Sequence, residues 1–186
     1  MLRPEAEIIS KHLRVLVGER NPYTSLNRLQ ATGRYLSEQF HKLQLGVLKQ
    51  EAPFNGIKTH NILGHKTGTE KTGGTFVLGA HYDTVEGTPG ADDNASAVAA
   101  LLEIARCLQP VPLKNSLIFA CFTLEEYGFA GSRHFVQQAR RSNLSIRGMI
   151  SMEMIGFRTR QPGSQSYPDY VDPARYPETG DFIALV

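Results

Sequence analysis

Residues 75–94 read Thr-Phe-Val-Leu-Gly-Ala-His-Tyr-Asp-Thr-Val-Glu-Gly-Thr-Pro-Gly-Ala-Asp-Asp-Asn, and the rest of the chain is arranged around them. An apolar run, 76–80, leads into His81-Tyr82-Asp83, and a loop rich in glycine and proline then precedes two aspartates that open a helix. A short apolar run bounded by glycine and polar residues is typical of a buried strand. Residues two apart on a strand point to the same face, so we expect His81 and Asp83 side by side. They would lie at the C-terminal end of the strand, where open α/β sheets place their active crevice.

A histidine beside a carboxylate at such a strand end suits a metal ion. Neutral imidazole is a good zinc ligand, and a neighbouring carboxylate fixes its tautomer and orientation. We therefore predict that His81 is a metal ligand and that Asp83 orients it. Taken alone, His81 would more simply be a hydrogen-bonded histidine, and Asp92 and Asp93 would be acids that cap a helix. The metal interpretation depends on more carboxylates at the ends of the next strands.

The remaining chain shows helical and strand patterns that predict an α/β fold. Helical spacing of apolar residues recurs in four segments, 4–18, 25–43, 94–108 and 129–140. Strand patterns occur in five segments, 44–54, 59–65, 75–81, 115–123 and 147–155. The alternation of strands and helices after residue 75 predicts a three-layer α/β sandwich with a mixed, largely parallel central sheet flanked by helices. A length of 186 residues fits a single domain, 1–186.

Composition excludes several classes of protein. The net charge of +2 gives no reason to expect a nucleic-acid or membrane-surface partner. No apolar stretch approaches the ~20 residues that a membrane span needs. The N-terminal residues do not resemble a secretory signal peptide, so we expect a cytoplasmic protein. Cys107 and Cys121 fall in a helical and a strand pattern, and we expect buried thiols rather than a disulfide.

Two further acidic positions follow the later strands. Glu125 and Glu126 come directly after the strand 115–123, where a bend can turn one carboxylate to a metal and the other to a neighbouring water. They could equally be acids at the start of the next helix. Glu153 decides between these interpretations, because it lies in what reads as a buried strand, 147–155, and an ionised carboxylate there is costly unless it is paired or metal-bound. We predict that His81, Asp93, Glu126 and Glu153 converge on a metal site.

Four motifs in this order resemble the di-zinc aminopeptidases of the bacterial leucyl aminopeptidase type, a group of zinc-dependent exopeptidases. They are Gly79-Ala-His-Tyr-Asp-Thr-Val, Gly90-Ala-Asp-Asp-Asn-Ala-Ser, Leu124-Glu-Glu-Tyr-Gly with Gly131-Ser-Arg, and Met152-Glu-Met-Ile-Gly. The likeness covers roughly residues 25–186. It implies a metallo-aminopeptidase that hydrolyses N-terminal residues from peptides by means of a zinc-activated water.

The resemblance also implies a role for each residue. His81, Asp93 and Glu153 would bind one Zn²⁺, Asp93 would bridge to a second Zn²⁺ held by Glu126, and Glu125 would be the general base. Asp93 rather than Asp92 is the bridging acid because it directly precedes Asn94, as in the family pattern. Relatives have a cis peptide after the bridging acid, so we expect one at Asp93-Asn94. Relatives often have aspartate where this chain has Glu153, which adds one methylene of reach.

The chain departs from the family pattern at its C-terminal side. Relatives take their last zinc ligand, a histidine, from a loop well beyond the strand that carries Glu153. The other histidines of this chain, at positions 12, 41, 60, 65 and 134, all precede Glu153. We therefore expect one complete and one incomplete zinc site, a catalytic domain that lacks its C-terminal portion, low activity, and self-association through an uncovered C-terminal side.

Two other functions compete with the aminopeptidase. Glutaminyl-peptide cyclotransferases have similar motifs around His81 and Gly131, but they use one zinc and lack the Asp-Asp-Asn-Ala-Ser pattern. A peptidase-like domain can also serve as a non-catalytic binding module. Retention of the four proposed ligands, His81, Asp93, Glu126 and Glu153, and of Glu125 argues against that module. A carboxypeptidase is a further alternative, because hydrolysis from either end of a peptide can use the same metal pair.

Overall fold

The structure is a computed structural model that describes residues 2–70 and 73–184, and its sheet is centred on β3 and β4. Strand β3 (Thr75–His81) lies between β4 (Ser116–Phe122) and β5 (Ile146–Ser151) and runs parallel to both. His81 is in register with Phe122, so β3 and β4 end at the same edge of the sheet. This edge receives the loops that carry the acidic residues.

The other half of the sheet is antiparallel. Strands β1 (Gly46–Phe54) and β2 (Ile57–Lys66) form a hairpin, and β2 pairs antiparallel with β4. The order β1-β2-β4-β3-β5 therefore gives a mixed sheet, as predicted, with its parallel pairings among β3, β4 and β5. Because β2 runs against β4, the start of β2 lies at the edge where β3 and β4 end.

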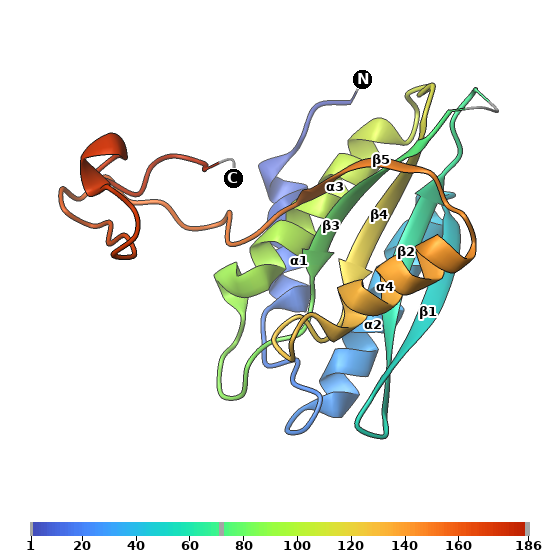
Figure 1. The fold of residues 1–186 in the computed structure, drawn as a ribbon, viewed down its shortest axis with the longest axis horizontal. Helices are drawn as coiled ribbons and strands as arrows, with labels where there is room; N and C mark the ends of the chain where they lie inside the picture. The colour runs from blue at the N-terminus through green and yellow to red at the C-terminus, as the bar shows by residue number, and fades with distance from the viewer. Residues whose placement is uncertain (1, 71–72, 185–186) are drawn as a thin grey trace.

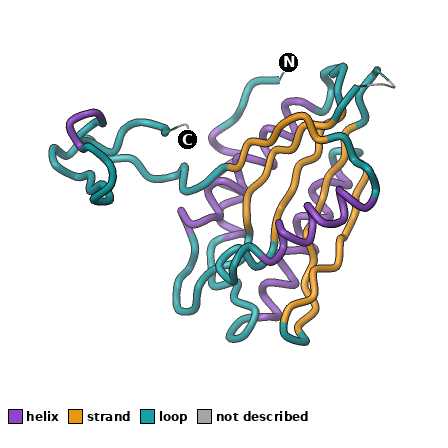
Figure 2. Tube along the Cα trace, viewed as in Figure 1, coloured by secondary structure: helices purple, strands orange, loops and turns teal. Residues whose placement is uncertain are grey.

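Helices cover both faces of the sheet and complete the predicted three-layer α/β sandwich (Figures 1 and 2). Helices α1 (Ala6–Leu16), α2 (Leu26–Lys42) and α3 (Ala97–Leu108) lie on one face. Helix α4 (Ala130–Arg141) lies on the other, over β1 and β2. These helices match the predicted helical segments to within a few residues.

Each face of the sheet has its own apolar core. On the face of α1, α2 and α3, fully buried side chains include Leu29, Leu36, Phe40, Leu101, Leu102 and Phe119. On the face of α4, a smaller cluster contains Leu63, Val77, Ile118, Phe122 and Phe135. Full burial of a side chain of this size stabilises the fold by ~1.5–3 kcal/mol, so these two clusters fix the position of β3 and β4.

The prediction of a buried strand over 147–155 is wrong. Strand β5 ends at Ser151, and most of its residues are exposed. The physical reason is its place at the edge of the sheet. There β5 pairs with β3, and among the described residues no helix packs extensively against it. Beyond β5 the chain leaves the body of the molecule, and its only helix among the described residues is the short 3-10 helix η2 (Pro173–Arg175) (Figures 1 and 2).

Within the described residues, none of the helices has both the length and the apolar character that crossing a bilayer requires. Cys107 and Cys121 are both buried free thiols, as the sequence predicts.

Candidate metal centre

His81, at the end of β3, is the centre of an acidic cluster. The residue is 4% exposed. Its Nε2 atom lies 3.0 Å from Asp93 Oδ1, 3.4 Å from Glu153 Oε1 and 3.9 Å from Glu125 Oε2. Carboxylates from one helical turn and two loops therefore meet at the imidazole nitrogen at the end of β3, at the predicted edge of the sheet.

Asp93 is presented by an irregular helical turn. This π-helical turn, η1 (Ala91–Ser96), precedes α3 and follows Gly90, which has φ of 56°. A Cβ at position 90 would lie 2.2 Å from Thr84 Cγ2, so only glycine fits there. The peptide bond between Asp93 and Asn94 is cis, as the resemblance predicts.

Asp83 contacts more of the site than the sequence suggested. It is fully buried, and its Oδ1 lies 3.5 Å from His81 Nδ1. Its two carboxylate oxygens also accept hydrogen bonds from the backbone amides of Glu125, at 3.0 Å, and Glu126, at 3.2 Å. Asp83 therefore positions the Glu125-Glu126 turn against His81, a role that the sequence analysis missed.

Glu153 is held by hydrogen bonds rather than by burial. Its side chain is 49% exposed, so the prediction that Glu153 is a carboxylate in a buried strand is wrong. The buried Asn94 donates from Nδ2 to Glu153 Oε2 at 2.8 Å and to the Met152 carbonyl at 3.0 Å. Asp92 Oδ1 accepts a hydrogen bond from the Gly156 amide at 2.7 Å. The motif around Asp93 thus fixes the loop that carries Glu153.

Asn94 and Ser96 both form hydrogen bonds to the loop that carries Glu153, and neither had a predicted role in holding it. Both lie in the motif Gly90-Ala-Asp-Asp-Asn-Ala-Ser. Ser96 Oγ donates to the Asp92 carbonyl at 2.7 Å and accepts from the Ile155 amide at 3.2 Å. Small polar residues directly after a predicted ligand are the signal that could have identified them.

Arg20 is a buried cation that no sequence pattern indicated. It is 1% exposed, and its guanidinium donates to the Tyr82 carbonyl at 2.7 Å and the Gly90 carbonyl at 3.0 Å. It also donates to carbonyl oxygens of Leu16, Gly18 and Pro89. Arg20 thereby ties the end of α1 to the backbone beside His81 and to the loop that leads to Asp93.

The acidic surroundings shift the pKa values of the site residues. Burial opposes protonation of His81, but the neighbouring Asp83 and Glu153 carboxylates outweigh it and raise the His81 pKa to about 10. Burial raises the pKa of Glu125, and the nearby Asp83 and Glu153 charges add to this rise. Burial also raises the pKa of Glu126, with the Asp93 charge as the next contribution. A bound cation would offset the repulsion among these carboxylates.

The geometry fits a bound metal ion. His81 Nδ1 and Asp93 Oδ1 are buried and have no hydrogen-bond partner among the described residues, although carboxylates and the imidazole lie close together. The ligand atoms of His81, Asp93 and Glu153 all lie within 4.8 Å of one another, as do those of His81, Glu125 and Glu126. Imidazole with carboxylates is a ligand set that suits zinc.

Comparison with known proteins places the site in a family. The family model described as Peptidase family M28 matches residues 61–177. YfbL of Escherichia coli K12 is 33% identical over 97% of this chain, and the alignment covers 59% of YfbL. Aminopeptidase YwaD of Bacillus subtilis is 33% identical over 68% of this chain, with 28% of YwaD covered. The alignment thus covers less than two thirds of the length of each of these relatives.

Solved structures show the same fold. LapB from Legionella pneumophila superposes with a TM-score of 0.76 at 22% identity, over 84% of this chain and 45% of LapB. Tannerella forsythia glutaminyl cyclase superposes with a TM-score of 0.65 at 26% identity, over 82% of this chain and 61% of that protein. Together with the family match over most of the chain, these findings show that the chain belongs to peptidase family M28.

Proposed function

We propose that this chain carries the zinc-binding part of an aminopeptidase that removes N-terminal residues from peptides. The observation that carries the proposal is the placement of two carboxylate sets around one imidazole, with Glu125 held 3.9 Å from His81 Nε2. The names of relatives, aminopeptidase YwaD of Bacillus subtilis and a probable leucine aminopeptidase of Aspergillus oryzae, support this class of reaction.

The proposed ligands fall into two groups. His81, Asp93 and Glu153 would hold one zinc ion, and Asp93 with Glu126 would hold a second. When bound, zinc lowers the pKa of a water and stabilises negative charge on the substrate carbonyl oxygen. No histidine other than His81 belongs to either cluster in the described part of the chain. We therefore expect the first zinc to bind tightly and the second weakly, with low turnover by this chain.

Glu125 is proposed as the general base. It lies in a turn whose backbone amides, those of Glu125 and Glu126, donate to the Asp83 carboxylate, which holds this turn beside His81. Burial raises its pKa above the ordinary value for a glutamate, which makes it a better acceptor for a proton. Glu125 would accept the proton of the attacking water and pass it to the leaving amine.

The test compares two adjacent substitutions, Glu125→Gln and Glu126→Gln. In a version of the chain that is supplied with the further histidine ligand, we expect Glu125→Gln to leave the zinc content nearly unchanged and to lower the turnover of aminoacyl anilides by about 10²–10⁴-fold, since it removes the base and no ligand. Glu126→Gln should instead weaken the second zinc. Elemental analysis and anilide assays with added zinc measure both. Loss of zinc from Glu125→Gln but not from Glu126→Gln would reverse the two roles.

A second candidate is a glutaminyl cyclase, which the likeness to the Tannerella forsythia enzyme supports. Cyclisation of a glutaminyl peptide releases ammonia and no amino acid, so an ammonia assay on such a peptide separates the two reactions. We expect release of N-terminal residues and no ammonia. A chain that binds zinc and peptide but performs neither reaction would instead be a binding module.

A further inference from the structure

A cavity outside the metal centre lies between α2 and the β1–β2 hairpin. Its volume is about 170 Å³, and its apolar wall is formed by Leu29, Ile62 and the ring of Tyr82. A cavity of about 150 Å³ holds a molecule the size of benzene. The cavity in this chain is therefore large enough for an apolar group of about six carbon atoms.

Helix α2 carries a glycine, Gly33, in the wall of the cavity. A Cβ at Gly33 would lie 3.3 Å from Tyr82 Oη and 3.7 Å from Ile62 Cδ1, so glycine allows α2 to approach Tyr82 closely and a larger side chain at position 33 would intrude on the cavity wall. Glycine inside a helix costs ~0.5–1 kcal/mol relative to alanine. The sequence keeps this cost in the middle of a 17-residue helix, beside the cavity.

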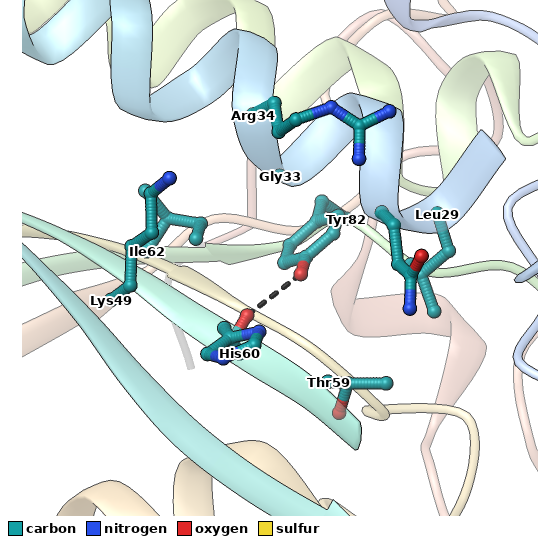
Figure 3. A pocket seen from close by; sticks show the side chains of 9 residues that line it. Leu29, Gly33, Arg34, Lys49, Thr59, His60, Ile62 and Tyr82 are labelled. Carbon is teal, nitrogen blue, oxygen red and sulfur yellow. Dashed lines mark hydrogen bonds between the residues drawn. The ribbon is translucent and has the colours of Figure 1, made fainter. Parts of the chain in front are cut away.

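The two hydroxyl groups in the wall already have partners. Tyr82 Oη donates to the His60 carbonyl at 2.7 Å (Figure 3). Thr59 Oγ1 donates to the Ala52 carbonyl at 2.8 Å. An occupant therefore finds no free hydroxyl donor in the interior, and the exposed Gln30, an uncharged polar side chain of the lining, makes no hydrogen bond to the described residues. Burial of an unpaired polar group beside Leu29 and Ile62 would be costly, which favours an apolar group there.

The mouth of the cavity is basic. Arg34 on α2 and Lys49 on β1 line it from opposite sides, with His60 below Tyr82 (Figure 3). Both charged side chains are exposed, and neither makes a hydrogen bond or ion pair with any residue that the structure describes. No aspartate or glutamate lines the described cavity. Arginine pairs with carboxylates through two parallel hydrogen bonds, and a lysine nearby adds a second positive charge.

We propose that this cavity binds a small monocarboxylate whose apolar body of about six carbons enters between α2 and β2 while its carboxylate meets Arg34 and Lys49. A free α-amino acid is a poorer match, because its ammonium group would face the same two cations. The site does not depend on zinc or on peptidase activity. Tyr82 lines the cavity and lies between His81 and Asp83 in the chain, so its backbone amide signal can report binding close to the metal centre.

The test measures binding of 5-methylhexanoate to the metal-free chain by calorimetry and by nitrogen–proton correlation spectra. Its neutral analogue, 5-methylhexanamide, has the same body without the charge. We expect saturable binding of the carboxylate, weaker binding of the amide, and shifts of the Gly33 and Tyr82 amide signals. Arg34→Gln and Lys49→Gln should each weaken carboxylate binding by about tenfold or more, as expected for charge-assisted hydrogen bonds.

Two further variants make the test specific. Gly33→Leu fills the cavity without changing its charge and should abolish binding, while Lys58→Gln, an exposed lysine on β2 outside the cavity, should bind as the parent chain does. If Gly33→Leu does not fold, carboxylate binding by the two variants at exposed positions, Arg34→Gln and Lys49→Gln, tests the proposal. Equal binding of carboxylate and amide, binding unchanged in both charge variants, or no binding would overturn the proposal.

Discussion

Strands β3 and β5 are parallel neighbours that differ in burial. Strand β3 ends in one proposed zinc ligand, His81, and strand β5 is followed by another, Glu153. His81 on β3 is 4% exposed, whereas the Glu153 side chain beyond β5 is 49% exposed. Leu78 on β3 is 9% exposed, and its register partner on β5, Ile150, is 63% exposed. The metal centre is thus assembled from a buried half and a surface half.

The two halves reach their positions by different means. His81 is fixed by the two apolar cores on either side of β3 and by Arg20 behind it. Glu153 is fixed by Asn94, which hydrogen-bonds to its carboxylate and to the backbone before it. The comparison predicts that changes behind β3 cost folding stability, whereas changes beside Glu153 cost metal affinity.

The largest expected effect is on stability and follows from Arg20→Met. Methionine occupies a similar space but has no donors, so buried carbonyl oxygens at Tyr82 and Gly90, among others, would lose their partners. Burial lowers the pKa of Arg20 to about 10, which leaves the guanidinium charged at neutral pH. We expect the free energy of unfolding to fall by about 3 kcal/mol or more in urea denaturation of the metal-free chain.

Arg14→Gln is the matched control for Arg20→Met, because Arg14 is an exposed residue of α1. Surface substitutions of this kind usually change stability by less than about 0.5 kcal/mol. Equal losses in the two variants would show that the buried half does not depend on Arg20.

The second prediction concerns the surface half. Asn94→Ala removes the hydrogen bonds to Glu153 and Met152 while leaving all proposed ligands in place. Loss of a partner that orients a ligand typically lowers metal affinity by about 10–100-fold. We expect such a loss of zinc affinity in competition titrations with a chelating dye. Asn27→Ala, at an exposed position on α2, is the control and should bind zinc normally. If zinc affinity were unchanged in Asn94→Ala but lower in Glu153→Gln, Glu153 would bind zinc without needing the hydrogen bond from Asn94.

A third prediction uses the pH dependence of the buried half. The His81 pKa in the metal-free chain is about 10, well above its ordinary value of 6.5, so the folded imidazole holds a proton that zinc must displace. The apparent zinc affinity should rise by about tenfold per pH unit between about pH 6 and 7.5.

The same shift has a consequence for stability without metal. Because the folded pKa lies above the unfolded one, the contribution of His81 is fully present below pH 6.5 and is lost as the pH rises through about 10. The free energy of unfolding of the metal-free chain should therefore fall across this window, and His81→Gln should remove that part of the fall. If the free energy of unfolding depended on pH in the same way in the parent chain and in His81→Gln, the raised pKa of His81 would be contradicted.

The sequence predicted the buried half of the molecule well. Short apolar runs ending in His81 and in the Glu125-Glu126 pair are signals of strands buried on both faces, and the structure has β3 and β4 there. The order of helices and strands was sufficient for the three-layer fold. These features depend on local pattern and burial, which a single sequence contains.

The surface half was harder to predict because its partners are distant in the chain. An apolar pattern does not show whether a strand lies at the centre or the edge of a sheet, so β5 was expected to be buried. Arg20 contacts backbone carbonyls up to 70 residues away, and such acceptors have no sequence signature. The pairing of Asn94 with Glu153 spans 59 residues and depends on the same tertiary arrangement.

The smallest expected effect on folding is that of a substitution on β5, and it is best compared with a substitution of the register partner on β3, Leu78 for Ile150. Ile150→Lys changes an exposed side chain and should alter the free energy of unfolding by about 0.5 kcal/mol or less. Leu78→Ala, at the paired position on β3, should cost about 2–5 kcal/mol. Strand β5 pairs with β3 alone among the described strands, and exposed apolar side chains, Met149 and Ile150, flank its open edge.

Such an edge can pair with a second copy, and a lysine on it opposes that pairing. We therefore propose that the chain self-associates through β5 and that Ile150→Lys shifts sedimentation toward the monomer without loss of stability. Lys58→Gln, on a strand away from this edge, should sediment as the parent chain does. A parent chain that is monomeric at every concentration, or an Ile150→Lys chain that associates as strongly as the parent, would show that β5 is exposed but does not act as an interface.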